Sequence, residues 1–217
     1  MTDPASQPAD NCAREIQNSV SASTGLLTRA SLFANLNDAR PQAREIAWEE
    51  FRARYFPVIA GFAKRCGASP QDVDDIIQDV MTGFIGTCET FVYDPAKGRF
   101  RGWLKTCTVR AAIRRAGKNL RFRGMQLADL PQVELAVEPE WNDVWEQQLV
   151  SQALTVLKCE CGETLPFRAF EQYVLLDRDA KVVATELGTS VNNVHQAKSR
   201  MTARLRGLVE ELRRLDD

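Results

Sequence analysis

The chain has 217 residues, of which 44% are hydrophobic and 26% are charged, and its formal net charge is -1. These values are ordinary for a globular protein in water, and no apolar run approaches the ~20 residues that a membrane-spanning helix needs. The first residues also lack the basic start and apolar core of a secretory signal, so we expect a cytoplasmic protein of one large or two small domains, without membrane insertion.

The N-terminal part of the chain predicts a leader followed by helices. Residues 1–25 are rich in Ser, Ala, Asn, Gln and Asp, and we expect them to form a disordered leader. A short helix is predicted at residues 26–35. Apolar side chains then recur at spacings of three and four from Trp48 to Phe62, which predicts a longer helix. Pro57 lies inside that pattern and is expected to kink or interrupt the helix.

A capping motif marks the start of the next helix. Ser69 is a candidate N-cap, Pro70 suits the first helical position, and Asp72 completes an S-x-x-D capping box. The following apolar residues recur at helical spacing: Val73, Ile76, Ile77, Val80, Met81, Phe84 and Ile85. The opposite face is polar and mostly acidic: Asp74, Asp75, Gln78, Asp79 and Thr82. The pattern alone is compatible with a solvated surface.

Positive charge is concentrated between residues 97 and 123, where ten Lys or Arg occur without any Asp or Glu. Trp103 and Leu104 can face a core at helical spacing. A basic stripe lies on another face, formed by Arg110, Arg114, Lys118 and Arg121. Because like charges at i, i+4 destabilise a helix, the stripe must be well solvated, or negative charges outside the helix must compensate it. This uneven distribution of charge along a near-neutral chain indicates a polyanionic binding partner.

A linker is predicted for residues 124–140, which contain two prolines, four acidic and no basic side chains, and no helical periodicity. Apolar residues at helical spacing begin again at Trp141, and a further helix is expected at 167–176. No β alternation and no internal repeat occurs. The sequence therefore predicts an all-α protein of two small helical domains, at 26–123 and 141–217, joined by a flexible linker.

The six cysteines do not suggest a metal site. Four of them are isolated within apolar or mixed patterns, which is typical of buried thiols in a reducing compartment. Cys159 and Cys161 form a Cys-x-Cys pair, but structural zinc usually has four ligands, and the single histidine, His195, is far away in the sequence. We expect no metal, no cofactor and no catalytic residue, and the role of the pair stays open.

The stretch AKVVATELGTSVNNVHQAKS, residues 180–199, fits a helix-turn-helix. Ala184 is a small residue where the second helix would cross the first, and Gly188 suits a turn with left-handed backbone. Ser190 is a candidate N-cap of the second helix. The apolar contacts would come from Val183, Leu187, Val194 and Ala197. A helical hairpin without a role in DNA binding is the alternative.

In a helix-turn-helix the second helix enters the major groove with its N-terminal residues nearest the bases. Asn and Gln pair with adenine, Lys pairs with guanine, and Arg also suits phosphates. The candidate DNA contacts are Ser190, Asn192, Asn193, His195, Gln196, Lys198, Arg200 and Arg204. For His195, an ordinary polar surface position is an equal alternative.

The order of these features resembles the sigma-70 family of bacterial RNA polymerase subunits, and more narrowly the two-domain sigma factors of the extracytoplasmic-function (ECF) type. The resemblance covers about residues 28–214. It is carried by TRASLFANLNDARPQAREIAWEEFRARYFPVIAGFAKR at the start, then SPQDVDDIIQDVMTGF, FVYDPAKGRFRGWLKTCTVRAAIRR and AKVVATELGTSVNNVHQAKSRMTARLR. It implies a protein that binds core RNA polymerase, directs promoter-specific transcription initiation and is not itself an enzyme.

The resemblance also implies sites. The acidic helix would dock on the β′ clamp through Asp74, Asp75, Ile76, Gln78, Asp79 and Phe84. The basic stretch would engage the promoter −10 element through Lys97, Arg99, Phe100, Arg101, Trp103, Lys105, Arg110, Arg114, Arg115 and Lys118. The helix-turn-helix would contact the −35 element. The β flap and an anti-sigma factor are further implied partners.

The mixture of cations and aromatic rings suits a melted promoter. Cationic side chains follow the backbone of a single strand, and aromatic rings stack on exposed bases for ~1–3 kcal/mol each. The Trp103 side chain could be buried in the core or could contact a base. Two other classes of protein remain open on the sequence: a stand-alone helix-turn-helix transcriptional regulator, and an enzyme with a thiol or zinc centre at Cys159 and Cys161.

Overall fold

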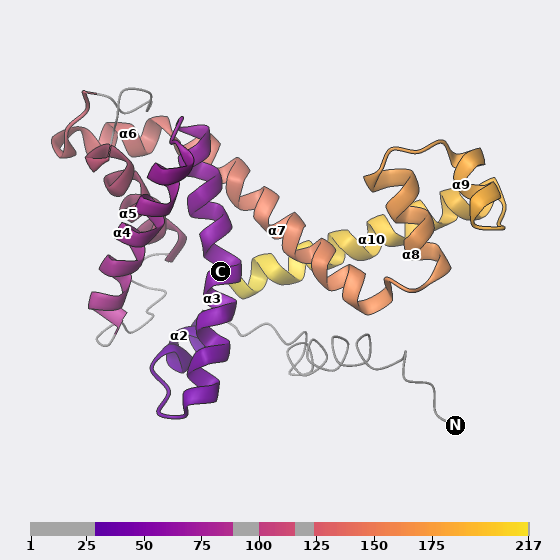
Figure 1. The fold of residues 1–217 in the computed structure, drawn as a ribbon, viewed down its shortest axis with the longest axis horizontal. Helices are drawn as coiled ribbons and strands as arrows, with labels where there is room; N and C mark the ends of the chain where they lie inside the picture. The colour runs from indigo at the N-terminus through magenta and orange to yellow at the C-terminus, as the bar shows by residue number, and fades with distance from the viewer. Residues whose placement is uncertain (1–28, 89–99, 116–123, 217) are drawn as a thin grey trace. The chain divides into compact units, whose positions relative to one another are not determined.

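The computed structural model describes residues 29–88, 100–115 and 124–216, whose course is drawn in Figure 1. The predicted leader, residues 1–25, lies outside them. The elements are α2 (Arg29–Leu36), α3 (Pro41–Arg65), α4 (Pro70–Cys88), α5 (Phe100–Arg114), the 3-10 turn η2 (Leu127–Asp129), α6 (Leu130–Ala136), α7 (Glu138–Cys161), α8 (Leu165–Phe170), the π-helical turn η3 (Glu171–Leu175), α9 (Ala180–Glu186) and α10 (Val191–Asp216). No strand occurs among the described residues, which confirms the all-α prediction.

The described chain divides into two compact units, residues 27–148 and 149–216. The first unit contains α2 to α6 and the start of α7, and the second contains the rest of α7 together with α8 to α10. The division therefore falls beyond the segment 124–140, for which the sequence analysis predicts a linker. The functional domain bounds given there remain a prediction.

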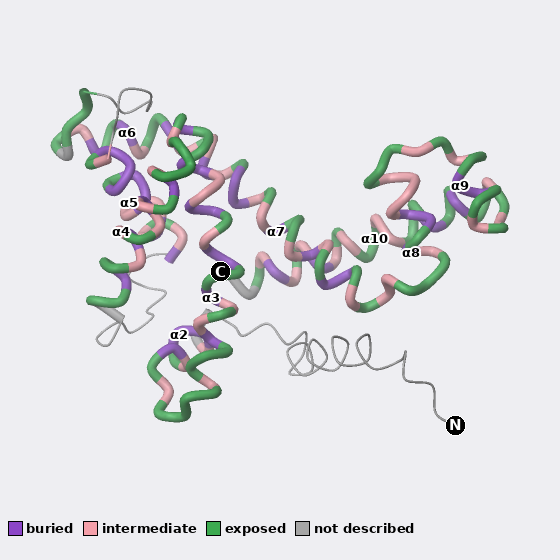
Figure 2. The backbone as a smooth tube through the Cα atoms, in the orientation of Figure 1, coloured by how far each residue is buried: buried purple, intermediate pink, exposed green. Residues whose placement is uncertain are grey.

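An aromatic cluster forms the core of the first unit and joins four helices. Phe33 of α2, Phe51 of α3, Phe84 of α4 and Phe100 of α5 are all at most 5% exposed. The rings of Phe51 and Phe84 stack with their centroids 4.7 Å apart, and the Phe33 and Phe100 centroids lie 4.7 Å apart as well. Burial of such rings is a large apolar contribution to stability, and it fixes α4 and α5 on α3. Figure 2 shows the buried segments in purple.

Helix α3 is continuous through Pro57, which the sequence analysis expects to kink or interrupt it. The residues around the proline are strongly buried, with Tyr55 and Val58 1% exposed and Ile59 fully buried. Tertiary packing of this face stabilises the helix and outweighs the loss of one backbone hydrogen bond. The proline itself is on the exposed side.

The segment 124–140 is helical where a linker without helical periodicity is predicted. Leu130, Val133 and Val137 are buried at spacings of three and four, so the segment does carry a helical apolar stripe. Pro131 lies in the first turn of α6 and Pro139 is the second residue of α7, positions at which a missing N–H costs little. These prolines start helices here, whereas the sequence analysis takes them to exclude helices.

The first turns of α7 complete the core of the first unit. Trp141 is 1% exposed and meets Phe62 of α3 at a centroid distance of 5.3 Å. Val144 is buried against Gly61, where a Cβ would lie only 3.0 Å from the valine Cγ1. Tyr55 and Trp145 add a further ring contact at 6.1 Å. The predicted helix from Trp141 is thus confirmed, but its first turns pack with α3.

The second unit has a smaller core. Ala169, Val183, Ala184, Val194 and Ala197 form one buried cluster, contributed by α8, α9 and α10. Small side chains at these crossings let the short helices approach closely. The cluster places α10 across α9 with one long face open to solvent, which is the arrangement that a helix-turn-helix requires.

Candidate partner and nucleic-acid interfaces

Helix α4 begins at the predicted capping box. The Asp72 N–H donates to Ser69 Oγ at 3.2 Å, and the Ser69 N–H donates back to Asp72 Oδ2 at 3.2 Å. These bonds satisfy backbone N–H groups at the start of the helix that have no acceptor within it, and they fix how the first turn is oriented. On the face away from the core, Asp74 and Gln78 are exposed, while Asp75 and Asp79 are half-buried.

Two of the residues assigned to polymerase docking lie in the core. Ile76 and Phe84 are both fully buried. Their side chains hold α4 against the aromatic cluster and offer no surface to a partner. Of the six residues assigned to docking, the four polar ones reach the surface: Asp74, Asp75, Gln78 and Asp79.

The half-buried carboxylates of α4 bind an arginine of the basic stretch. Arg115 donates from Nε and Nη2 to the two oxygens of Asp79, each at 2.9 Å, and from Nη1 to Asp75 Oδ2 at 2.6 Å. These hydrogen bonds hold the pKa of Asp79 below its usual value. The two carboxylates are one helical turn apart, so a single guanidinium bridges both of them.

The two described aromatic residues of the basic stretch, Phe100 and Trp103, pack in or against the core. Phe100 is 2% exposed and belongs to the core cluster. Trp103 is half-buried, stacks on Phe100 with a centroid distance of 5.3 Å, and meets the edge of Phe84 at 5.5 Å. Of the two alternatives left open for Trp103, packing against the core is therefore observed, and part of its surface still reaches solvent.

The cations of α5 lie on different faces of the helix. Arg101 donates to Asn142 and lies over the Trp145 ring, 5.0 Å from its centroid, and Lys105 pairs with Glu138. Both therefore face the start of α7. Arg110 and Arg114 are exposed and make no ion pair with a described residue. The remaining −10 candidates, Lys97, Arg99 and Lys118, lie outside the described residues.

The turn and the N-cap predicted for residues 180–199 occur in the structure. Asp179 caps α9 by accepting from the Lys181 N–H at 2.8 Å, and Ser190 caps α10 by accepting from the Asn193 N–H at 3.2 Å. Gly188 has a φ of 61°, the left-handed backbone that favours glycine.

We expect Gly188→Ala to lower the free energy of unfolding of the second unit by about 1 kcal/mol, because a Cβ penalises left-handed backbone. The matched control is Gly207→Ala within α10, where a Cβ meets nothing within 4 Å and alanine should add about 0.5–1 kcal/mol. Denaturation followed by far-UV circular dichroism measures both variants. Equal effects of the two substitutions would contradict the role assigned to the turn.

Five of the eight predicted DNA contacts in this region already have intramolecular partners. The Asn193 amide donates to Thr189 Oγ1 at 3.0 Å. His195 meets the Tyr173 ring at a centroid distance of 5.4 Å, and the Lys198 ammonium lies 5.3 Å from the same ring. Arg204 donates to both oxygens of Glu160, at 2.6 and 3.0 Å, which raises the pKa of the guanidinium. Ser190 serves as the N-cap.

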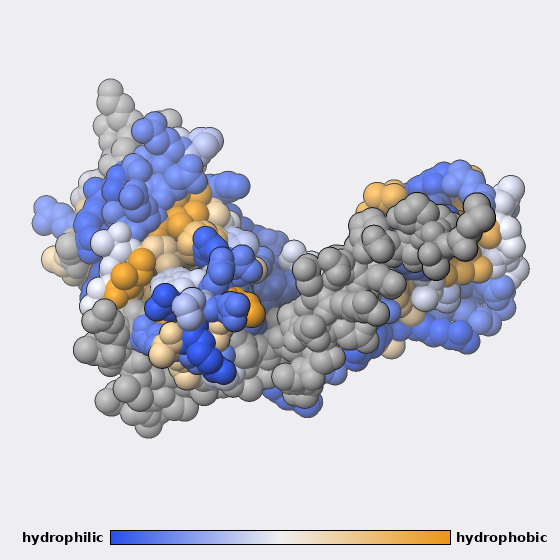
Figure 3. Space-filling model, turned by 60° about the horizontal axis from the view of Figure 1, so that its bottom comes forward, coloured by the Kyte–Doolittle hydropathy of each residue, from blue (hydrophilic) through white to orange (hydrophobic). Residues whose placement is uncertain are grey.

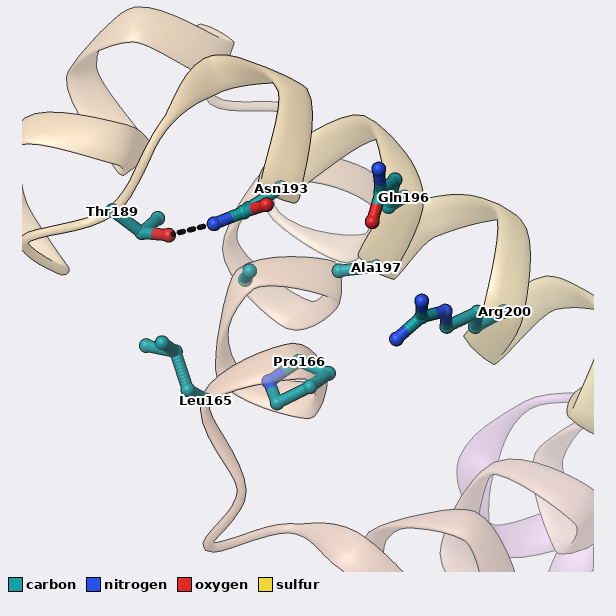
Figure 4. Close-up of a pocket in the computed structure, with 8 residues that line it drawn as sticks. Leu165, Pro166, Thr189, Asn193, Gln196, Ala197 and Arg200 are labelled. Atoms are coloured by element: carbon teal, nitrogen blue, oxygen red, sulfur yellow. Dashed lines mark hydrogen bonds between the residues drawn. The ribbon is translucent and has the colours of Figure 1, made fainter.

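The remaining predicted contacts of α10 present open surface. Asn192, Gln196 and Arg200 are exposed and make no hydrogen bond or ion pair with a described residue. Gln196 and Arg200 border a hollow of about 250 Å³, shown in Figure 4, whose other wall is Leu165 and Pro166 at the start of α8. The figure shows the Arg200 side chain extending from α10 toward α8. This hollow combines amide, guanidinium and apolar groups on one face.

Sequence reasoning misses Leu165 and Pro166 as members of this face. Leu165 is 44% exposed, which is unusual for a leucine at the start of a helix beside polar neighbours. The sequence signal that could have revealed them is Thr164, the N-cap of α8. Its hydroxyl oxygen accepts a hydrogen bond from the Phe167 N–H at 3.3 Å, so α8 begins at Leu165, and α8 packs against α10. On the face drawn in Figure 3, orange hydrophobic areas lie among mainly blue hydrophilic ones.

The described residues give no support to a metal or thiol centre. No group of three His, Cys, Asp or Glu side chains that could hold a metal ion occurs among them. Cys161 Sγ donates to the Leu157 carbonyl oxygen at 3.0 Å and lies 3.8 Å from Met201 Sδ. Burial raises the pKa of the Cys161 thiol, and burial likewise raises that of Cys107. Raised pKa values disfavour the reactive thiolate.

Hydropathy of the helices gives one further observation. None of the helices in the described ranges combines the length and the apolar character that crossing a bilayer demands.

Comparison with known proteins gives one match, which falls within the first unit. No curated protein and no solved structure matches the chain. A family model does: residues 51–122 match Sigma-70 region 2. The matched segment contains α4 with its acidic face and α5 with its basic stretch. The match supports a sigma-70 family sigma factor.

Proposed function

We propose that this chain is an RNA polymerase sigma factor of the ECF type, which binds core RNA polymerase and directs promoter-specific transcription initiation. The observation that carries the proposal is the match of residues 51–122 to Sigma-70 region 2. The helix-turn-helix of α9 and α10, which lies outside the matched segment, supports a second contact with promoter DNA. Catalysis would belong to the polymerase.

The proposal assigns different chemistry to the two units. In the first unit, the acidic face of α4 would bind the basic side chains of the β′ clamp, and Arg110 and Arg114 would neutralise phosphates of the −10 element. In the second unit, Asn192 and Gln196 would contact base edges of the −35 element, and Arg200 a phosphate or a guanine. The β flap and an anti-sigma factor are further proposed partners.

The test is reconstitution with purified core RNA polymerase. The full chain is expected to co-elute with the core enzyme in gel filtration and to produce transcripts from a restricted set of promoters in vitro. Tight binding to duplex DNA without polymerase, together with no co-elution, would instead favour a stand-alone helix-turn-helix regulator. Such regulators usually act as dimers on paired half-sites, so the oligomeric state on DNA is a second discriminating measurement.

We expect the double variant Asp74→Lys/Gln78→Lys to weaken binding to core polymerase by roughly tenfold or more, because it places like charges against a basic partner. Both side chains are exposed and make no ion pair with a described residue, so the fold should persist. The matched control is Gln42→Lys/Glu45→Lys on α3, which makes the same charge change at exposed positions. Equal binding by both double variants would contradict docking through α4.

A further inference from the structure

The ion pair between α4 and α5 joins two surfaces to which the proposed function gives different partners. Arg115 is assigned to DNA, whereas Asp75 and Asp79 are assigned to polymerase, yet the three side chains bind one another through three hydrogen bonds of 2.6–2.9 Å. Their side chains are 34%, 37% and 27% exposed, so all three are reachable from solvent.

This geometry withholds Arg115 from nucleic acid. With both carboxylates ionised, the cluster carries one positive and two negative charges, and a phosphate that approaches Arg115 meets a net negative site. Arg110 and Arg114, which precede it on α5, are exposed and have no described carboxylate partner. In the described part of the chain, Arg110 and Arg114 are therefore open to DNA, whereas Arg115, which directly follows α5, is held back.

The pair is also suited to exchange. Ion pairs at half-exposed positions are weakly favourable, because water solvates the separated charges nearly as well. A basic side chain of a partner that binds Asp75 and Asp79 would compete directly with Arg115. The arginine would then lose its partners and become available to a phosphate at little cost.

We propose that Arg115 couples the two binding events: a basic partner surface that binds Asp75 and Asp79 releases Arg115 to the DNA backbone. The proposal rests on the proposed function, in which the partner is the core polymerase. By thermodynamic reciprocity, polymerase and DNA then each increase the affinity for the other by the same factor. The exchange gives the free chain weaker affinity for single strands than the polymerase-bound chain.

The first test mimics the partner in the absence of polymerase. Asp75→Asn/Asp79→Asn removes the charges that hold Arg115, and binding of a labelled oligothymidylate to the full chain is measured by fluorescence anisotropy across a salt titration. One added phosphate contact should steepen the salt dependence by about 0.7 in log–log slope and tighten binding roughly fivefold at 0.1 M salt. In an Arg115→Gln background the same two changes should leave the slope unaltered.

A matched control separates this effect from general electrostatics. Glu45→Gln/Glu49→Gln removes two exposed negative charges of α3 in the same unit, neither of which pairs with a described residue. It should leave the salt slope as in the wild-type chain. An equal slope in both double variants, an increase that persists without Arg115, or no binding by any variant would overturn the proposal.

The second test uses core polymerase without DNA. Arg115→Gln removes the intramolecular competitor and should strengthen binding to the core enzyme several-fold. Arg52→Gln makes the same charge change at an exposed position of α3 and should leave that affinity unchanged. Unchanged or weaker binding by Arg115→Gln would overturn the proposal. Failure of the wild-type chain to bind polymerase would overturn the proposed function, and the oligothymidylate measurement would still decide whether the carboxylates withhold Arg115.

Discussion

Replacing Trp141 by alanine should destabilise the first unit by about 3–5 kcal/mol, the range for removal of a large buried aromatic side chain. The ring is 1% exposed and packs against Phe62 of α3. Such a loss is a large fraction of the stability of a small domain, so the unit should unfold at a much lower urea concentration.

The measurement can be made on the full chain. All four tryptophans, Trp48, Trp103, Trp141 and Trp145, precede residue 148, so tryptophan fluorescence follows the first unit alone, while far-UV circular dichroism follows both. The control is Leu135→Ala on α6, whose side chain is 78% exposed and should cost little. A wild-type urea midpoint for Trp141→Ala would show that the start of α7 is not part of this core.

Replacing Asn192 and Gln196 by alanine should remove most of the upstream-element preference of the reconstituted polymerase. A good bidentate contact to a base discriminates by ~1–3 kcal/mol, so the two losses together correspond to roughly 30-fold to 10⁴-fold. Both side chains are exposed on α10 and make no hydrogen bond with a described residue, so the helix should form as before. The measurement is binding to a panel of duplexes with single changes in the upstream element.

Arg200→Ala separates base contact from phosphate contact at the same surface. If Arg200 binds a phosphate, its loss should weaken binding to all duplexes alike and lower the salt slope by about 0.9. If it binds guanine, the loss should depend on one base pair. An unaltered preference in the Asn192→Ala/Gln196→Ala variant would contradict the assignment of α10 as the reading helix.

The sequence predicts the elements whose signals are local. The capping box at Ser69, the turn at Gly188 and the N-cap at Ser190 each depend on residues within four positions, and all three occur in the structure. The all-α class follows from spacing alone. The sequence does not predict α6 and the first residues of α7, because Pro131 and Pro139 are typical helix breakers, although proline also suits a first turn.

The candidate sites were less predictable because their chemistry depends on distant partners. Arg115 and Asp75 are 40 residues apart in the chain, and no sequence pattern pairs them. Arg204 and Glu160 are 44 residues apart. Periodicity identifies Ile76 as apolar, but only packing shows that it is fully buried and has no surface for a partner. Charge runs thus indicate the class of ligand, and tertiary contacts decide which charges remain available.

The close approach of α7 to Gly61 makes two positions of the chain interdependent. Because a methyl group at position 61 would sit 3.0 Å from Val144 Cγ1, alanine there requires the valine to move or shrink. Val144→Ala alone leaves a void, whereas Gly61→Ala combined with Val144→Ala refills it in part. The fitness effects of these two substitutions are therefore epistatic, and a library randomised at both sites should recover them as a correlated pair.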